Sequence, residues 1–173
     1  MQMIFTTLMV SLFRILPHAP NFTPVGALAI LNGRTQPKKQ AFLSIVVAMV
    51  VSDFLLAQIY GYAFLSSISL FIYLAFIVQA AIGATFKNVK FGIVLSALLG
   101  ALSFFFISNF AVWATSGMYS KNLPGLIACY KSALPFFRMT LISNLLWTPV
   151  LVMGHALAKK HLFLKKSLSS VKN

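Results

Sequence analysis

A few polar side chains stand inside long apolar stretches of this sequence, and they carry whatever chemistry the chain can do. Asp53 supplies the only acidic group among 173 residues. Asparagine and glutamine amides supply paired donors and acceptors, and tryptophan and tyrosine rings supply flat apolar walls. These are the materials of a small-molecule pocket rather than of a catalytic centre.

Composition places these residues in a membrane protein. Sixty per cent of the residues are hydrophobic and only 9% are charged, whereas a soluble domain carries about 25% charged residues. The formal net charge is +13, but the basic residues lie between apolar runs instead of covering a polar surface. We therefore expect contact with a lipid bilayer and no nucleic-acid partner.

The apolar segments predict an all-α membrane protein, a compact bundle of about six transmembrane helices of which the two N-terminal ones are short. Three prolines between Pro17 and Pro24 interrupt the first apolar stretch. Residues 2–16 lack a preceding positive charge and a cleavage site, so a retained span is favoured over a signal peptide. The sequence leaves open whether residues 22–33 cross the membrane fully. The expected spans are 2–16, 22–33, 40–59, 64–86, 91–115 and 138–158, in one domain over residues 1–158 that is followed by a basic cytoplasmic tail over residues 159–173.

Basic residues orient this bundle. With the C-terminal tail in the cytoplasm, ten of them lie inside and four lie outside, as the positive-inside rule requires. We therefore expect a protein of the cell (inner) membrane with both termini cytoplasmic and with an outer loop over residues 116–137. The inside residues are Arg34, Lys38, Lys39, Lys87, Lys90, Lys159, Lys160, Lys165, Lys166 and Lys172, and the outside ones are Arg14, Lys121, Lys131 and Arg138.

Counted along these spans, strong hydrogen-bonding groups from several segments fall in the outer half of the membrane. Asn109 and Trp113 also share one helix face, because they are four residues apart. Gln79, in contrast, counts to the inner half. Convergence at one depth predicts an outward-facing pocket. The candidate substrate-binding residues are His18, Asn21, Thr23, Asp53, Asn109, Trp113, Tyr130, Arg138 and Asn144.

Each candidate also has a purely structural explanation. Asp53 could pair with Arg14 or Arg138 to hold helices together. Asn109 and Asn144 could form interhelical hydrogen bonds worth on the order of 1 kcal/mol each. The tryptophan could belong to an interfacial belt and the histidine could cap the turn. Small residues spaced four apart likewise predict close helix packing within the chain, at Ala80/Ala84, Ala97/Ala101 and Ser96/Gly100.

The remaining residue types argue against an enzyme. One carboxylate is too few for paired-carboxylate acid–base catalysis. His18 lies on the opposite side of the expected membrane from His155 and His161, and Cys129 is the only cysteine, so no metal site and no disulfide are expected. A Gly-rich phosphate loop is missing too, which excludes a nucleotide-driven pump made of this chain alone. We expect no cofactor.

The stretch Arg14-x-x-Pro17-His18-x-Pro20-Asn21-Phe22-Thr23-Pro24 resembles the signature of a family of small bacterial membrane proteins without an established activity. Later motifs of that family are matched over residues 14–155. They are Ser52-Asp53, Ser108-Asn109-Phe110-x-Val112-Trp113, Tyr119, Gly125-Leu126, Cys129-Tyr130 and Ala133-x-Pro135-Phe136-Phe137. The resemblance implies a multi-pass membrane protein and implies no particular reaction.

More loosely, the layout is similar to the substrate-binding S-components of energy-coupling-factor transporters. That resemblance implies a small bundle with both termini inside, an outward-facing vitamin pocket, and an ATPase borrowed from a shared coupling module. The Ala-xxx-Ala contact motif typical of the first span of S-components is missing, since residues 2–16 contain no alanine. Ala29 and Gly33 in the second short span form a variant of it.

Two functions follow from these patterns. The leading hypothesis is the substrate-binding subunit of an importer for a small, vitamin-like molecule. The alternative is a structural or assembly protein whose intramembrane polar residues only fix helix packing. A small channel is disfavoured, because the inner half of the bundle has little polar lining.

Overall fold

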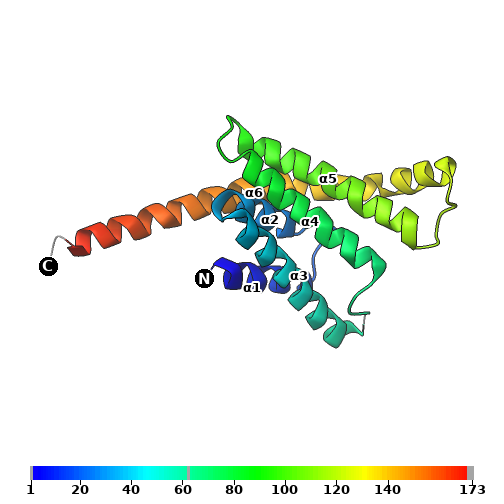
Figure 1. Cartoon of the computed structure of the whole chain (residues 1–173), viewed down its shortest axis with the longest axis horizontal. Coiled ribbons are helices and arrows are strands. Elements are labelled where there is room, and N and C mark those ends of the chain that lie inside the picture. The colour runs from blue at the N-terminus through cyan, green and yellow to red at the C-terminus, as the bar shows by residue number, and fades with distance from the viewer. Residues whose placement is uncertain (1, 62, 171–173) are drawn as a thin grey trace.

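Six α-helices make up the described part of the chain, which covers residues 2–61 and 63–170 (Figure 1). Within these residues there is no β-strand. Side chains are described for residues 3–61 and 63–161, so the predicted inside residues Lys165, Lys166 and Lys172 fall outside them. The bounds in this computed structural model are α1 (Gln2–Ile15), α2 (Val25–Thr35), α3 (Lys38–Tyr60), α4 (Ser67–Thr85), α5 (Gly92–Thr115) and α6 (Leu123–Ser170).

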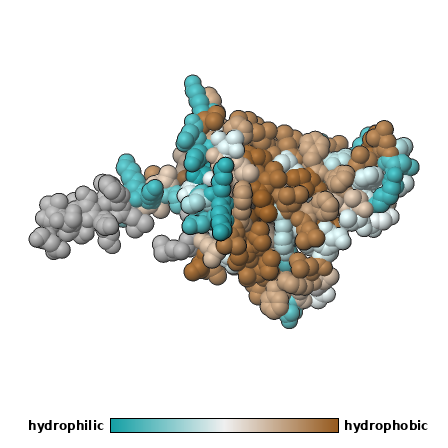
Figure 2. Space-filling model, in the orientation of Figure 1, coloured by the Kyte–Doolittle hydropathy of each residue, from teal (hydrophilic) through white to brown (hydrophobic). Residues whose placement is uncertain are grey.

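Four helices, α3 to α6, are long and apolar enough to cross a membrane. Their outward side chains are largely apolar; Leu70 is 63% exposed and Phe106 is 55% exposed. Figure 2 shows a broad hydrophobic surface over the body of the bundle. A soluble monomer rarely exposes an apolar surface of that extent, whereas lipid covers it without cost. The predicted all-α membrane bundle is therefore confirmed.

Helix α2 lies in the middle of the bundle although it has only 11 residues. Every residue from Val25 to Gly33 is buried, and α2 packs against each of the other five helices. Two glycines permit its close approach to α4. A Cβ at Gly33 would collide with the Ala80 carbonyl, and a Cβ at Gly83 would collide with the Ile30 carbonyl. Close packing at Ala80 thus takes place within the chain, as expected.

Helices α1 and α2 are both too short to cross a bilayer. Their 14 and 11 residues extend about 21 and 17 Å, against a hydrocarbon core of about 30 Å. Residues 16–24, the N-terminal turn, join them through Asn21, whose φ of 61° is left-handed. Asn21 and Phe104 line the same cavities, and α5 continues eleven residues beyond Phe104 to Thr115. The tip of the N-terminal turn therefore lies well short of the end of α5, whereas its start is close to the end of α3, because the Tyr60 hydroxyl donates to the Ile15 carbonyl at 3.2 Å.

Basic residues gather at one end of the bundle, the basic end, which comprises Arg34, Lys38, Lys39, Lys87 and Lys90. The end of α2 is tied to the α4–α5 loop there, because Arg34 donates to the carbonyls of Phe86 at 3.1 Å and Lys87 at 3.0 Å. Figure 2 shows a hydrophilic band on this side, and in Figure 1 α1 begins and α6 projects outward on the same side. The opposite end, where α3 and α5 end, is the far end.

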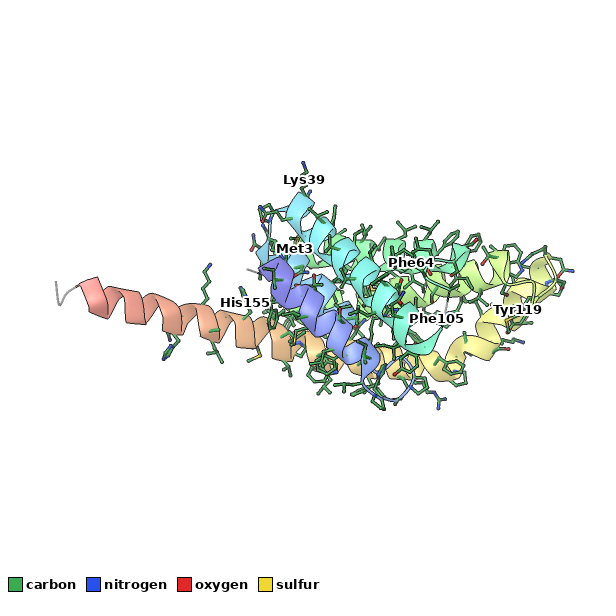
Figure 3. All side chains as sticks on the ribbon, turned by 90° about the horizontal axis from the view of Figure 1, so that it is seen from below. Met3, Lys39, Phe64, Phe105, Tyr119 and His155 are labelled. Carbon is green, nitrogen blue, oxygen red and sulfur yellow. The ribbon has the colours of Figure 1, made fainter. Side chains whose placement is uncertain are left out.

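Helix α6 corrects the expected outer loop. The loop covers residues 116–122 rather than 116–137, because α6 already begins at Leu123. The Asn122 side chain accepts the Gly125 N–H at 2.9 Å, which is the geometry of a helix N-cap. The helix then continues through Pro135 and Pro149. It also extends past the basic end of the bundle beyond His155 (Figure 3).

The glycine contacts predict a sharp difference between two alanine substitutions. Gly33→Ala should lower the free energy of unfolding by about 1–3 kcal/mol, because its Cβ would meet backbone that cannot rotate away. Gly154→Ala is the matched control, since its Cβ would meet open space. Thermal unfolding of the purified proteins in one detergent measures both. Equal melting temperatures for the two variants would contradict the central position of α2.

Candidate functional site

Three adjoining cavities lie around the N-terminal turn. A large cavity of about 550 Å³ is lined by residues of the turn together with α1, α3, α4 and α5. A side cavity of about 180 Å³ lies between α5 and α6, and a deep cavity of about 40 Å³ lies between α2, α4, α5 and α6. Asn21 and Phe104 line all three. The cavities thus adjoin one another at the tip of the turn, and we treat them as one candidate site.

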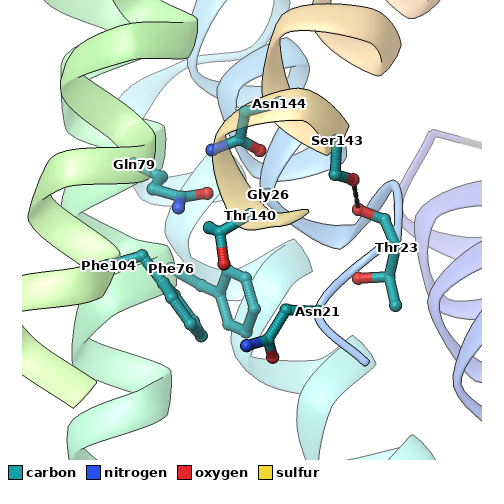
Figure 4. A pocket seen from close by; sticks show the side chains of 9 residues that line it. All are labelled: Asn21, Thr23, Gly26, Phe76, Gln79, Phe104, Thr140, Ser143 and Asn144. Carbon is teal, nitrogen blue, oxygen red and sulfur yellow. Dashed lines mark hydrogen bonds between the residues drawn. The ribbon is translucent and has the colours of Figure 1, made fainter. Parts of the chain in front are cut away.

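The deep cavity is built around two buried amides, Gln79 of α4 and Asn144 of α6 (Figure 4). Gln79 is 1% exposed and Asn144 is 3% exposed. A Cβ at Gly26 would lie 2.5 Å from Asn144 Oδ1 and 2.5 Å from Gln79 Oε1, so the two amide oxygens converge where glycine leaves room. The full lining consists of Asn21, Thr23, Gly26, Phe76, Gln79, Phe104, Thr140, Ser143 and Asn144.

Both amides are only partly satisfied. Gln79 Nε2 donates to the Gly100 carbonyl at 2.9 Å, which fixes the orientation of that amide and leaves Oε1 facing away from the bond. Among the described residues, neither Gln79 Oε1 nor Asn144 Nδ2 has a hydrogen-bond partner. A buried polar atom without a partner costs about 1–3 kcal/mol, so a water molecule or a ligand group that reached these two atoms would offset that cost.

Three predicted site residues come together on the N-terminal turn. Asn21 and Thr23 line both the deep and the large cavity, and His18 lines the large one. His18 Nδ1 lies 2.6 Å from the Leu16 carbonyl, which matches the alternative that it holds the turn. Ser143 donates to the Thr23 carbonyl at 2.7 Å and so fastens the turn to α6.

The only acidic residue is engaged in a network between helices. Asp53 of α3 pairs with Arg14 of α1 at 2.6 Å and accepts a hydrogen bond from the Tyr73 hydroxyl of α4. Arg14 also donates to Ser52 Oγ at 2.5 Å. The guanidinium lines the large cavity, but Asp53 is not among the residues lining any of the three. Of the two partners considered for Asp53, the structure selects Arg14.

The other predicted residues divide between the cavities and the far end. Asn109 and Asn144 line the side and deep cavities, respectively. Trp113 lines none of the three cavities. It lies near the end of α5, and its Nε1 donates to the Ser120 carbonyl at 3.0 Å. Tyr130 donates to the Phe106 carbonyl at 2.8 Å. Arg138 is exposed and lines none of the three cavities.

Gln79 is the site residue that depth counting missed. The expected levels placed Gln79 in the inner half and Asn144 in the outer half, yet the two converge at Gly26. The expected depth of Asn144 was measured from the lysines of the C-terminal tail. That reference is wrong, because α6 continues past the basic end of the bundle and those lysines do not mark where the bundle ends. The sequence did carry a signal for Gln79, because a single amide within an apolar span usually faces the interior of the bundle.

The deep cavity offers hydrogen-bonding groups of uncharged side chains. The deep cavity has amides, hydroxyls and rings but no ionisable side chain. Over the described residues, no group of three or more histidine, cysteine or acidic side chains is arranged to hold a metal ion. The arrangement supplies fixed hydrogen-bonding groups beside the aromatic pair Phe76 and Phe104, whose ring centroids are 5.1 Å apart.

The Arg14–Asp53 pair predicts a strong effect of single substitutions and a weaker effect of an exchange. Asp53→Ala should cost about 3 kcal/mol of stability, because it leaves the guanidinium at membrane depth without its partner. The double variant Arg14→Asp/Asp53→Arg should recover part of that loss. Thermal unfolding measures both, with Arg138→Ala as the exposed control. A double variant no more stable than Asp53→Ala would argue against pairing as the main role of Asp53.

The comparisons with known proteins agree with the expectation of a family without an established activity. The chain matches a family described as "Family of unknown function (DUF6580)" over residues 1–168. No curated protein and no solved structure matches it. Since the match covers nearly the whole sequence, the chain belongs to the DUF6580 family of unknown function.

Proposed function

We propose that this membrane protein binds a small molecule in the cavities around the N-terminal turn, as the substrate-binding subunit of an importer. The observation that carries the proposal is the meeting of two short helices short of the end of α5, directly beside a cavity of about 550 Å³. Within the hydrocarbon core, chain without helical hydrogen bonds is tolerated only where protein covers it or where it lines a cavity. In transporters, broken helices of this kind form the substrate site.

The form of the large cavity supports entry from the far end. Leu16, Pro17 and His18 line it and are exposed, so the turn forms a rim, while the amides of the deep cavity form a base. The basic end lies on the opposite side of the bundle. With the basic end in the cytoplasm, as the positive-inside rule favours, the rim faces outwards and both termini are cytoplasmic in the cell (inner) membrane.

The role is one of capture without catalysis. The chain carries no phosphate-binding loop in its sequence, so a separate coupling module would supply the energy for import. The resemblance to S-components supports this division of work, with a vitamin-like molecule as the substrate. The part of α6 that extends beyond the bundle provides the exposed residues Lys159 and Lys160 on the cytoplasmic side, where such a module would meet the protein.

A structural or assembly protein is the second candidate. The specific observation in its favour is the network of Arg14, Asp53 and Tyr73, which connects α1, α3 and α4. It uses the only carboxylate of the chain for helix packing. This candidate leaves the unsatisfied amides of the deep cavity without a role, and for that reason we place it second.

Blocking the cavities should remove a bound compound. We expect protein extracted gently into lipid nanodiscs to carry an enriched small molecule that mass spectrometry detects. Thr23→Trp should lose it, because residue 23 lines both the deep and the large cavity. Met118→Trp is the matched control, since it adds the same ring at a position that is 73% exposed.

Both variants must remain folded for the comparison, as judged by gel filtration and melting temperature. Retention of the compound by Thr23→Trp would contradict the proposed site. Folded wild-type protein without any enriched compound would favour the structural candidate instead.

A further inference from the structure

We propose that the deep cavity binds an uncharged amide-type edge, meaning an N–H donor beside a C=O acceptor on a flat molecule, as in a carboxamide, lactam or ureide. This inference rests on the proposed function and names the chemical class of its substrate. It is carried by the unsatisfied atoms Gln79 Oε1, which faces Gly26 at the first turn of α2, and Asn144 Nδ2, which faces Gly100 of α5.

The first step is the absence of charge. None of the nine residues that line the deep cavity is ionisable. The guanidinium of Arg14 lines the large cavity, but its positive charge is paired with the Asp53 carboxylate at 2.6 Å. A charged group moved into this cavity would lose its hydration without gaining an opposite charge. An uncharged ligand avoids that cost.

The second step is the kind of hydrogen bond that remains to be made. Gln79 Oε1 can only accept, and its orientation is fixed by the bond from Nε2 to the Gly100 carbonyl. Asn144 Nδ2 can only donate. A ligand that satisfies both must present a donor and an acceptor side by side. A carboxylate has no donor for Gln79 Oε1. An ammonium group can donate to the two amide oxygens at Gly26 but leaves Asn144 Nδ2 unsatisfied.

The first turn of α2 adds a further preference. Gly26 faces both amides, and the first N–H groups of any helix have no partner within it. Helix α2 follows Pro24, with no side-chain cap. These N–H groups and the positive end of the helix dipole repel an ammonium group and attract a carbonyl oxygen. Gln79 Oε1, on the same side, repels a carboxylate. An amide edge suits both neighbours.

The aromatic pair accounts for the flat body of the ligand. Phe76 and Phe104 line both the deep and the large cavity. With the amide edge in the deep cavity of about 40 Å³, the remainder of the molecule lies against these rings and extends into the large cavity. Flat rings stack favourably on such side chains.

Three probes that share a phenyl ring and differ in the head group test this inference: benzamide, benzoate and benzylammonium. Each is titrated at neutral pH against the full chain in nanodiscs, with calorimetry or the shift in melting temperature as the measurement. Probes of this size bind at about millimolar concentration. We expect benzamide to bind at least about tenfold more tightly than either charged probe, because only benzamide leaves no group of the site unpaired.

Gln79→Leu should weaken benzamide binding by about tenfold, through loss of the acceptor. Gln58→Leu removes an amide from an exposed position of α3 outside the three cavities and should change nothing. Asn144→Leu provides a second variant should Gln79→Leu fail to fold, and the same loss is expected of it.

The outcomes separate this inference from the proposed function. Equal binding of the three probes, abolished by Thr23→Trp, would overturn the amide edge and leave the binding site standing. Tighter binding of benzoate or benzylammonium would overturn it in the same way. If no probe binds and folded wild-type protein carries no compound, both proposals fail. Benzamide binding that Gln79→Leu leaves unchanged would overturn the assignment of this residue and with it the inference.

Discussion

The rest of the structure depends on the close approach of α2 to α4. An 11-residue helix that is buried on all sides can hold its place only where neighbouring backbones come nearly into contact, and Gly33 and Gly83 make that possible. Because α2 is central and short, the chain turns back before it reaches the level where α5 ends. The N-terminal turn and its cavities are a consequence of this packing. They would not arise from six helices of full length.

Glycine serves the site as well as the fold. Gly26 begins the same helix, and its missing side chain lets the Gln79 and Asn144 amides converge on the α2 backbone. A buried amide with an unpaired atom costs free energy, and the described chain carries two of them at one position. Packing alone gives no account of that cost, since apolar side chains of similar size would fill the same space. The proposed binding gives one, because a ligand or water would satisfy both atoms together.

The amino-acid sequence predicts the long helices well and the geometry between them poorly. Helices α3, α4 and α5 begin and end within three residues of the expected spans, since apolar length and flanking charge determine where a span ends. The start of α6 was missed because the helix continues through Pro135. Asn21 and Thr23, which the sequence suggested as binding residues, line the deep cavity. The proximity of Gln79 and Asn144 was not predictable, because it depends on the axial position of α6 relative to the other helices.

Two different interactions position the two parts of the site. The rim, on the N-terminal turn, follows an α1 helix whose end is fixed to α3 by the Arg14–Asp53 pair. The base is fixed by the backbone contacts of α2 with α4 at Gly33 and Gly83 and by the hydrogen bond from Gln79 to the Gly100 carbonyl. A charge pair at the rim can be separated at the cost of one interaction, whereas packed backbones cannot yield without disturbing every neighbour of α2. Any movement that admits a ligand should therefore occur at α1 and the turn, while the amides below stay in place.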